Sequence, residues 1–250
     1  MVGDDQRPLI LLKGGTLIEM QLGLRARATA DVDTLYRGDF DFILDTLDAV
    51  LKQPWGPITF QRTSPETITN ARRRVQPLRF DVKLLIGSRT WRRVTVEVSP
   101  DEGRAGASHT LVEAPPLAHF GLPDPDRLVG LAVDYQVAQK LHACTDPHQP
   151  PEYINDRARD IVDLHLLRDA FYSAESSAAS LAGACRDVFE TRYREAEELG
   201  GEPRSWPPRI RAYPSWGADF SRACEAAGIV LDLRQTVSVL NSWIDEIDGH

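Results

Sequence analysis

The sequence has no long hydrophobic run and few cysteines. Its longest apolar stretch, Leu9–Leu12, is far shorter than the roughly 20 residues that span a bilayer, and the N-terminus lacks the apolar core of a signal peptide. The three cysteines are widely spaced and none belongs to a CxxC pair, which argues against a disulfide framework and against structural zinc. We therefore expect a cytoplasmic protein with reduced thiols and no membrane partner.

The charge balance is acidic. The chain has 29 basic and 37 acidic residues, a formal net charge of -8, which opposes non-specific adhesion to nucleic acid. A nucleic-acid substrate would therefore need a local basic patch. Two adjacent segments supply a candidate, namely Arg72, Arg73, Arg74, Arg79, Arg89, Arg92 and Arg93. A solvated charged surface is the alternative interpretation of these arginines.

The first half of the chain has the hydrophobic patterns of a mixed sheet with helices. Helices are expected at Thr16–Leu24 and Phe42–Leu51, and Gly14 and Gly15 would form the turn before the first of them. Strands are expected at Leu9–Leu12, Thr29–Leu35, Ile58–Phe60, Leu78–Gly87 and Trp91–Ser99. The last two strands are close enough to form a hairpin.

A proline-rich segment, Ala114–Pro125, precedes a change to helical periodicity. Helices are expected at Leu128–Cys144, Asp156–Phe171, Ser176–Leu199, Asp219–Ala227 and Leu233–Ile247. A chain of 250 residues can form one large domain or two small ones. We predict an α+β protein in which residues 1–125 form a mixed sheet with flanking helices and residues 126–250 form a mainly helical domain.

Two aspartates in the second expected strand form the clearest candidate site. Asp31 and Asp33 are two residues apart, so their carboxylates point to the same face of a strand and can bind the same divalent ions. Two-metal phosphoryl transfer needs this arrangement. A short DxD motif also occurs by chance in acidic loops, so its context decides its meaning.

Two neighbouring features support the site. The segment Lys13–Thr16, "KGGT", lies at a strand-to-helix turn, where backbone amides and a helix N-terminus can approach phosphate oxygens, although it is not a Walker loop. A plain tight turn is the alternative. Glu97 lies among valines in an expected strand, so it faces either solvent or a polar cleft, where it could act as a third carboxylate.

The helical half contains further charged candidates. Lys140 lies on one expected helix, and Asp160 and Asp163 share a face of the next, with Arg157 one turn before Asp160. A surface lysine and a helix-capping carboxylate are the alternative interpretations. The HxCxxxH string at His142–His148 lacks the second cluster of ligands that a tetrahedral zinc site needs. The sequence contains no GxSxG motif, the pattern that would indicate a serine hydrolase.

Taken in order, "LLKGGT", "RATADVD", "VAQKLHA" and "RARDIVDLHLL" resemble the AbiEii/AbiGii toxin family of nucleotidyltransferases. The resemblance covers about Leu9–Arg168 and is weaker around Trp206–Trp216. It implies a DNA-polymerase-beta-like catalytic fold and membership of a toxin–antitoxin pair. Some members of the family transfer nucleotides from a nucleoside triphosphate to the 3′ acceptor end of tRNA and so block translation.

The resemblance also implies roles for individual residues. Asp31 and Asp33 match the metal-binding pair, and Thr29 matches the Ser or Thr that precedes it. Lys140 matches a lysine that engages the triphosphate, and Asp160 matches the acidic residue that completes the site. The turn that faces the phosphates is matched by Gly14, Gly15 and Thr16, with Lys13 beside them.

The resemblance implies attack by an acceptor hydroxyl on the α-phosphate of a nucleoside triphosphate, with Mg²⁺ or Mn²⁺ as cofactor. Glu97, Asp160 and Asp163 are the candidates for the third carboxylate. A tRNA acceptor and a cognate antitoxin protein are the expected partners. The alternatives are a nucleotidyltransferase that modifies a protein hydroxyl or a small molecule, and a catalytically inactive protein-binding module.

Overall fold

A computed structural model describes residues 2–3, 5–23, 26–27, 29–69, 73–172 and 178–250. The chain forms two compact units. The first consists of Met1–Gln21 and Thr29–Leu131, and the second of Leu22–Ala28 and Ala132–His250.

The first unit is built on one mixed sheet of eight strands with the order β3-β5-β6-β2-β1-β8-β7, and β4 pairs with β5. The strands are β1 (Ile10–Lys13), β2 (Asp31–Tyr36), β3 (Ile58–Arg62), β4 (Glu66–Thr67), β5 (Leu78–Ile86), β6 (Arg89–Pro100), β7 (His109–Val112) and β8 (Leu128–Leu131). β2 runs parallel to β6, and β1 runs parallel to β8. The other pairs, including the β5–β6 hairpin, are antiparallel.

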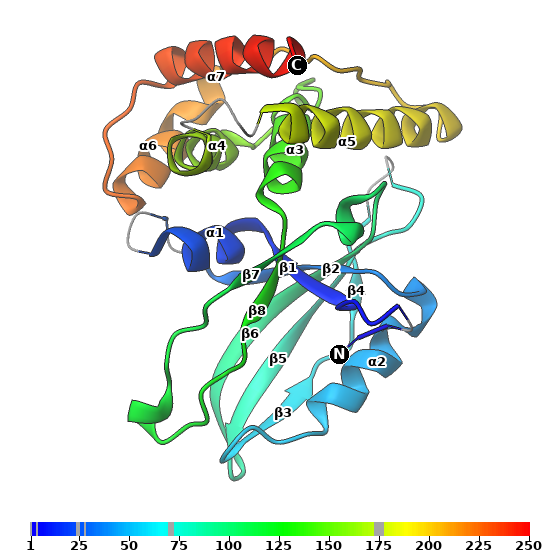
Figure 1. Cartoon of the computed structure of the whole chain (residues 1–250), viewed down its shortest axis with the longest axis vertical. Helices are drawn as coiled ribbons and strands as arrows, with labels where there is room; N and C mark the ends of the chain where they lie inside the picture. The colour runs from blue at the N-terminus through cyan, green and yellow to red at the C-terminus, as the bar shows by residue number, and fades with distance from the viewer. Residues whose placement is uncertain (1, 4, 24–25, 28, 70–72, 173–177) are drawn as a thin grey trace. The chain divides into compact units, whose positions relative to one another are not determined.

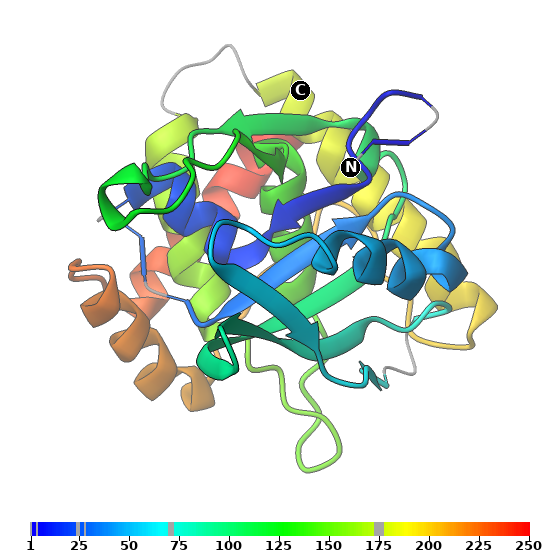
Figure 2. The ribbon, with the colours of Figure 1, turned by 90° about the horizontal axis from the view of Figure 1, so that it is seen from below.

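Helices α1 (Gly14–Leu22) and α2 (Ile43–Leu51) follow β1 and β2 in the chain (Figure 1). Short 3-10 helices occur at η2 (Phe40–Phe42), η3 (Ala105–Ala107) and η4 (Ala118–Phe120). α2 lies against β3 in both views of the ribbon (Figures 1 and 2). Ile43 of this helix joins a cluster of buried apolar side chains from the sheet, namely Tyr36, Phe80, Val82 and Val98.

The alternation of strand residues gives the sheet two different faces. In β6, Val96 and Val98 point to the apolar cluster that α2 covers. Thr95 and Glu97 alternate with these valines along the strand, so they point to the opposite face. Burial of the valine face therefore places the polar residues of β2, β5 and β6 together on the other side of the sheet.

The sequence-based prediction of one helix over Leu128–Cys144 is wrong in its first turn. Residues Leu128–Leu131 form β8, which pairs with β1 and β7, and the helix α3 begins only at Val133. Gly130 packs closely on α1, because a Cβ there would lie 2.4 Å from Leu17 Cδ1. Tertiary pairing with two strands that are distant in sequence therefore overrides the local helical pattern.

The second unit is helical. Its helices are α3 (Val133–Cys144), α4 (Ala158–Phe171), α5 (Ala178–Glu198), α6 (Gly217–Ala226) and α7 (Leu233–Asp248), with the 3-10 turn η6 (Pro214–Trp216). α3 contacts α4 and α5, while α4 also contacts α6 and α7. The predicted start of the third helix, at Ser176, lies outside the described residues. Among the helices that the structure describes, none has the length and apolarity needed to cross a membrane.

Candidate active site

Charged side chains form a row across the polar face of the sheet. Asp33 on β2 is paired in register with Lys13 on β1 and with Glu97 on β6, and Glu97 is paired with Arg79 on β5. Residues paired in register project to the same face, so these four side chains are neighbours. Asp31 lies two residues before Asp33 and shares this face. The structure thus brings the two predicted aspartates together with Lys13 and Glu97.

The N-terminus of α1 lies directly against Asp33. Gly14, the first residue of the helix, has a φ of 65°, and a Cβ at this position would lie 2.1 Å from Asp33 Oδ2. Thr16 Oγ1 donates a hydrogen bond to the backbone oxygen of Asp31. The first N–H groups of a helix have no intrahelical acceptor and carry the positive end of the helix dipole. This helix end therefore offers N–H donors beside the carboxylates.

Gly14→Ala is expected to lower the transfer activity that the sequence resemblance implies by about a hundredfold, because the new methyl group would displace Asp33 or α1. Left-handed backbone alone costs an alanine about 1–2 kcal/mol. Gly121→Ala is the matched control, since Gly121 has a φ of 73° and nothing within 4 Å of its added Cβ. Urea unfolding should show a loss of stability for both variants, larger for Gly14→Ala because of the clash with Asp33. A transfer assay should show a loss of activity only for Gly14→Ala. Equal activity of the two variants would contradict the requirement for a glycine at position 14 beside Asp33.

Thr29 and Glu97 have contacts that were not expected from the sequence. The backbone N–H of Thr29 donates to Glu19 Oε2 of α1 at 3.2 Å, which ties the start of β2 to that helix. Glu97 accepts hydrogen bonds from Arg79, with Nε at 2.8 Å from Oε1. This contact with Glu97 raises the pKa of Arg79. Glu97 is therefore beside Asp33 but bound to a guanidinium.

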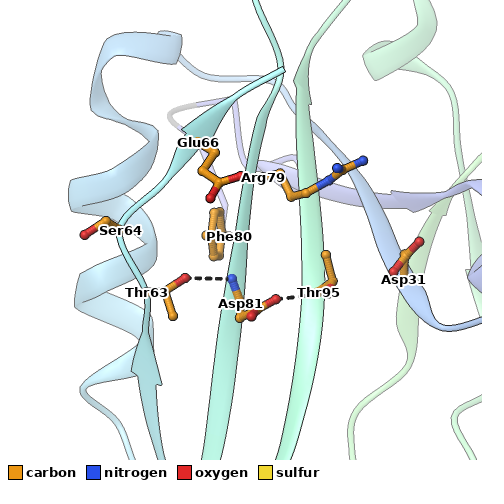
Figure 3. A pocket seen from close by; sticks show the side chains of 8 residues that line it. All are labelled: Asp31, Thr63, Ser64, Glu66, Arg79, Phe80, Asp81 and Thr95. Atoms are coloured by element: carbon orange, nitrogen blue, oxygen red, sulfur yellow. Dashed lines mark hydrogen bonds between the residues drawn. The ribbon is translucent and has the colours of Figure 1, made fainter. Parts of the chain in front are cut away.

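A pocket of about 370 Å³ opens on the same face of the sheet (Figure 3). It is lined by Asp31, Thr63, Ser64, Glu66, Arg79, Phe80, Asp81 and Thr95. Thr95 Oγ1 donates to Asp81 Oδ1 at 3.0 Å, and Thr63 Oγ1 accepts from the Asp81 N–H at 2.9 Å. The part of the chain that the structure describes contains no group of three or more His, Cys, Asp or Glu side chains placed to hold a metal ion.

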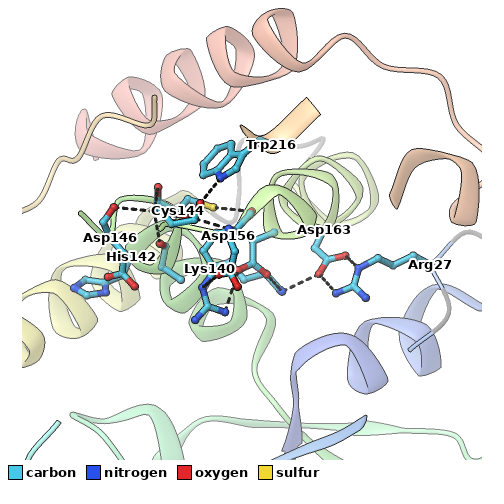
Figure 4. A network of polar contacts seen from close by, with 12 residues as sticks. Arg27, Lys140, His142, Cys144, Asp146, Asp156, Asp163 and Trp216 are labelled. Atoms are coloured by element: carbon cyan, nitrogen blue, oxygen red, sulfur yellow. Dashed lines mark hydrogen bonds and ion pairs between the residues drawn. The ribbon is translucent and has the colours of Figure 1, made fainter. Parts of the chain in front are cut away.

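The second unit contains a buried ionic network (Figure 4). Lys140 Nζ on α3 donates to Asp160 Oδ1 at 2.6 Å and to Asp163 Oδ2 at 2.8 Å, both on α4. Arg27 donates to both oxygens of Asp163 at 3.0 Å. The side chain of Asp163 is fully buried, and that of Lys140 is 11% exposed. Lys140 is therefore not a surface lysine.

The network favours the charged forms of Lys140 and Asp160. Burial disfavours the charge on Lys140, but the attraction of Asp160 and Asp163 outweighs it and raises the pKa of Lys140 above its ordinary value. Burial likewise opposes ionisation of Asp160, while Lys140 and Arg157 lower its pKa below the ordinary value. Arg157 also forms an ion pair with Asp160, with Nη1 3.9 Å from Oδ2. The result is a lysine held as a cation at neutral pH.

Comparison with known proteins identifies the family. The family described as "Nucleotidyl transferase AbiEii toxin, Type IV TA system" matches residues 2–236. The chain belongs to the AbiEii family. This AbiEii protein is accordingly a nucleotidyltransferase and a toxin of a type IV toxin–antitoxin system, which implies a nucleoside triphosphate substrate and an antitoxin partner. A search of curated proteins found no match.

Among solved structures, the AbiEii chain is similar to MenT4, a nucleotidyltransferase toxin from Mycobacterium tuberculosis H37Rv. The two are 16% identical with a TM-score of 0.44, and the match covers 100% of this chain and 86% of that chain. The family expected from the four motifs is confirmed, as are the mixed sheet with flanking helices and the class of enzyme.

The arginines expected to form one basic patch in this AbiEii toxin are used in different ways. Arg73 binds Glu102 at 3.0 Å and is largely buried, and Arg79 binds Glu97. Arg72 lies outside the described residues. Three of the arginines lie on one strand, β6, and all three are exposed: Arg89, Arg92 and Arg93.

Three residues of these clusters were missed by sequence reasoning. Arg27 opens the quoted segment "RATADVD", but it lies 136 residues from Asp163, and nothing in the sequence indicated that these two side chains pair. Asp81 and Thr95 line the pocket beside Asp31, and the only signal for them was their alternation with buried residues in two long strands.

Proposed function

We propose that this AbiEii toxin is a metal-dependent enzyme that transfers a nucleoside monophosphate from a nucleoside triphosphate to the 3′ end of tRNA and thereby inhibits translation. The observation that carries the proposal is the placement of Asp31 and Asp33 on one sheet face, with the N-terminus of α1 against Asp33. Because these substrates are cytoplasmic, the proposal also places the reaction in the cytoplasm.

The two aspartates fit Mg²⁺ or Mn²⁺. Mg²⁺ prefers oxygen ligands and is commonly held by one or two carboxylates together with substrate phosphates, so a third protein carboxylate is not obligatory. The absence of a Cβ at Gly14 lets the Asp33 carboxylate lie directly against the start of α1, where a Cβ would clash with Asp33 Oδ2. When bound, such an ion would neutralise the charge that develops on the transferring phosphoryl group.

The chain's own residues would bind and orient the triphosphate. Lys13 and the amides at Gly14–Thr16 present positive charge and N–H donors to phosphate oxygens. We propose that Lys140 serves the same reaction as a second cation, kept charged by Asp160 and Asp163. Charge stabilisation of this kind dominates phosphoryl transfer.

The acceptor oxygen would form a bond to the α-phosphorus while the bond from that phosphorus to the bridging oxygen breaks, releasing pyrophosphate. A carboxylate would take the hydroxyl proton. Glu97 is a candidate because it lies beside Asp33 in register, and release from Arg79 would free its oxygens. Asp160, whose side chain is 13% exposed, is an alternative third carboxylate; Asp163 is a poorer one, because it is fully buried and both of its oxygens accept hydrogen bonds from Arg27.

The acceptor class is tested with purified protein, nucleoside triphosphates labelled at the α-phosphate, Mg²⁺ and total tRNA. Label on tRNA that a 3′ exonuclease removes supports the proposal. Label on protein or on a small molecule instead would mean a different acceptor. No label under any of these conditions, with either metal, would favour an inactive protein-binding module.

A further inference from the structure

The free end of the β5–β6 hairpin is basic and carries an exposed tryptophan. Residues 82–94 contain four basic and no acidic side chains, within a chain of net charge -8. Trp91 is 60% exposed, and a register shift at Leu84 and Leu85 leaves it outside the regular pairing of the two strands. Burial of apolar surface in this unit gives no reason for an exposed indole among cations, whereas single-stranded nucleic acid binds such surfaces by stacking and charge.

This basic end runs along β6 to the pocket beside Asp31. Arg93 is paired in register with Lys83, and two residues further along β6 Thr95 is paired with both Asp31 and Asp81. Two strand residues span about 7 Å. Arg93 Nη1 reaches Asp81 Oδ2 at 3.3 Å, so a cation of the hairpin already contacts a residue that lines the pocket.

The pocket itself is a poor site for a triphosphate. Three carboxylates, Asp31, Glu66 and Asp81, line it against one guanidinium, Arg79, which is bound to Glu97. A polyanion would be repelled there. A nucleoside with free hydroxyl groups suits the pocket better, because carboxylate and hydroxyl oxygens can accept hydrogen bonds from it.

We propose that the pocket and the hairpin together hold the unpaired 3′ end of an RNA acceptor. The terminal nucleoside occupies the pocket with its 3′ hydroxyl at Asp31, the preceding phosphate lies at Arg93 and Lys83, and a base before it stacks on Trp91. This inference rests on the proposed function and names the part of the acceptor that is recognised. A protein hydroxyl would bring neither a phosphate for the two cations nor a base for the indole.

Binding is measured first, without nucleoside triphosphate, by fluorescence anisotropy of a 5′-labelled single-stranded oligoribonucleotide. Trp91→Ala should weaken binding about tenfold or more, as loss of a stacked base does. Lys83→Gln and Arg93→Gln should each weaken binding and lower the salt dependence by about one ion. Phe120→Ala and Arg127→Gln are the matched controls, since these side chains are 78% and 63% exposed elsewhere in the same unit.

The transfer assay then tests the position of the terminal nucleoside. In the three hairpin variants the KM for RNA should rise about tenfold, while kcat and the KM for the nucleoside triphosphate stay within about twofold. An acceptor whose last ribose lacks its 2′ hydroxyl should have a higher KM with the wild-type protein. If Asp81 accepts a hydrogen bond from this 2′ hydroxyl, the rise in KM that follows its removal should be several-fold smaller in the Asp81→Asn variant than in the wild type.

The outcomes separate this inference from the proposed function. If transfer to RNA is unchanged when Trp91, Lys83 or Arg93 is substituted, the proposed binding of RNA along the hairpin (the hairpin path) is overturned and the proposed function still stands. Binding that depends on Trp91 without transfer by the wild-type protein would support the path and overturn the function. Hairpin substitutions that release a bound protein but leave RNA binding unchanged would overturn the path.

Discussion

Asp31→Asn is expected to lower the rate of nucleotide transfer at least about a hundredfold, without loss of the fold. The substitution keeps the shape of the side chain but removes the negative charge that binds a divalent ion. Asp31 is exposed at the first position of β2, and only its backbone oxygen accepts the hydrogen bond from Thr16. Exposed substitutions of this kind change the free energy of unfolding by less than about 0.5 kcal/mol.

Three measurements check the prediction. Transfer of α-labelled nucleotide should fall, calorimetric titration with Mn²⁺ should show weaker binding, and urea unfolding should be unchanged. Asp126→Asn, which also removes an exposed carboxylate from the first unit, should behave as the wild type in all three. If Asp31→Asn retained wild-type transfer, the metal site would have to lie elsewhere.

Lys140→Met is expected to lower the free energy of unfolding by about 3 kcal/mol or more. The substitution removes the nearest cation from Asp160, which keeps Arg157 at 3.9 Å and the more distant charge of Arg27, while Asp163 keeps its two hydrogen bonds from Arg27. Removing one partner of a buried ion pair commonly costs about 3–5 kcal/mol, because the remaining charge is left without compensation. Urea unfolding followed by circular dichroism measures this loss.

A double variant separates the structural role of Lys140 from its proposed catalytic role. Lys140→Met with Asp160→Asn removes both charges, so much of the lost stability should return. Nucleotide transfer should stay low in the double variant, because the cation proposed to engage the triphosphate is still absent. Recovery of transfer together with stability would show that Lys140 acts only as a structural residue.

The same network predicts how stability depends on pH. The pKa of Asp160 is lowered in the folded protein, so its contribution is present above the unfolded value of about 3.9 and is lost as the pH falls through the folded value. The pKa of Lys140 is raised, so its contribution is present below about 10.4 and is lost only as the pH rises through its folded value. Between about pH 5 and pH 9 the network's contribution should be constant.

Urea unfolding between pH 3 and pH 6 tests the acidic limb of this curve. The wild-type protein should lose stability more steeply towards pH 3 than the double variant, which lacks Asp160 as a titrating group. Parallel curves for the two proteins would mean that Asp160 has the same affinity for protons in the folded and unfolded states.

The pattern of the sequence was sufficient for most elements of the first unit. Alternation of apolar and polar residues predicted β2, β5 and β6, because a two-sided sheet that buries one face imposes that period. The same period placed Asp31 and Asp33 on one face. The same period did not decide whether Glu97 faces solvent or a polar cleft. Only the pairing of the strands showed that Glu97 lies beside Asp33 and contacts Arg79.

By itself, the sequence determined the family and the class of enzyme, through four motifs in order along the chain. It also determined which residues local periodicity brings together, since these depend only on neighbours within one strand or helix. Tertiary structure alone decided that Leu128–Leu131 join the sheet, that Arg27 binds Asp163, and that the basic hairpin leads to the pocket beside Asp31. Each of these depends on which distant segments pack together. That choice is made by burial of the whole apolar surface, which no local window of residues records.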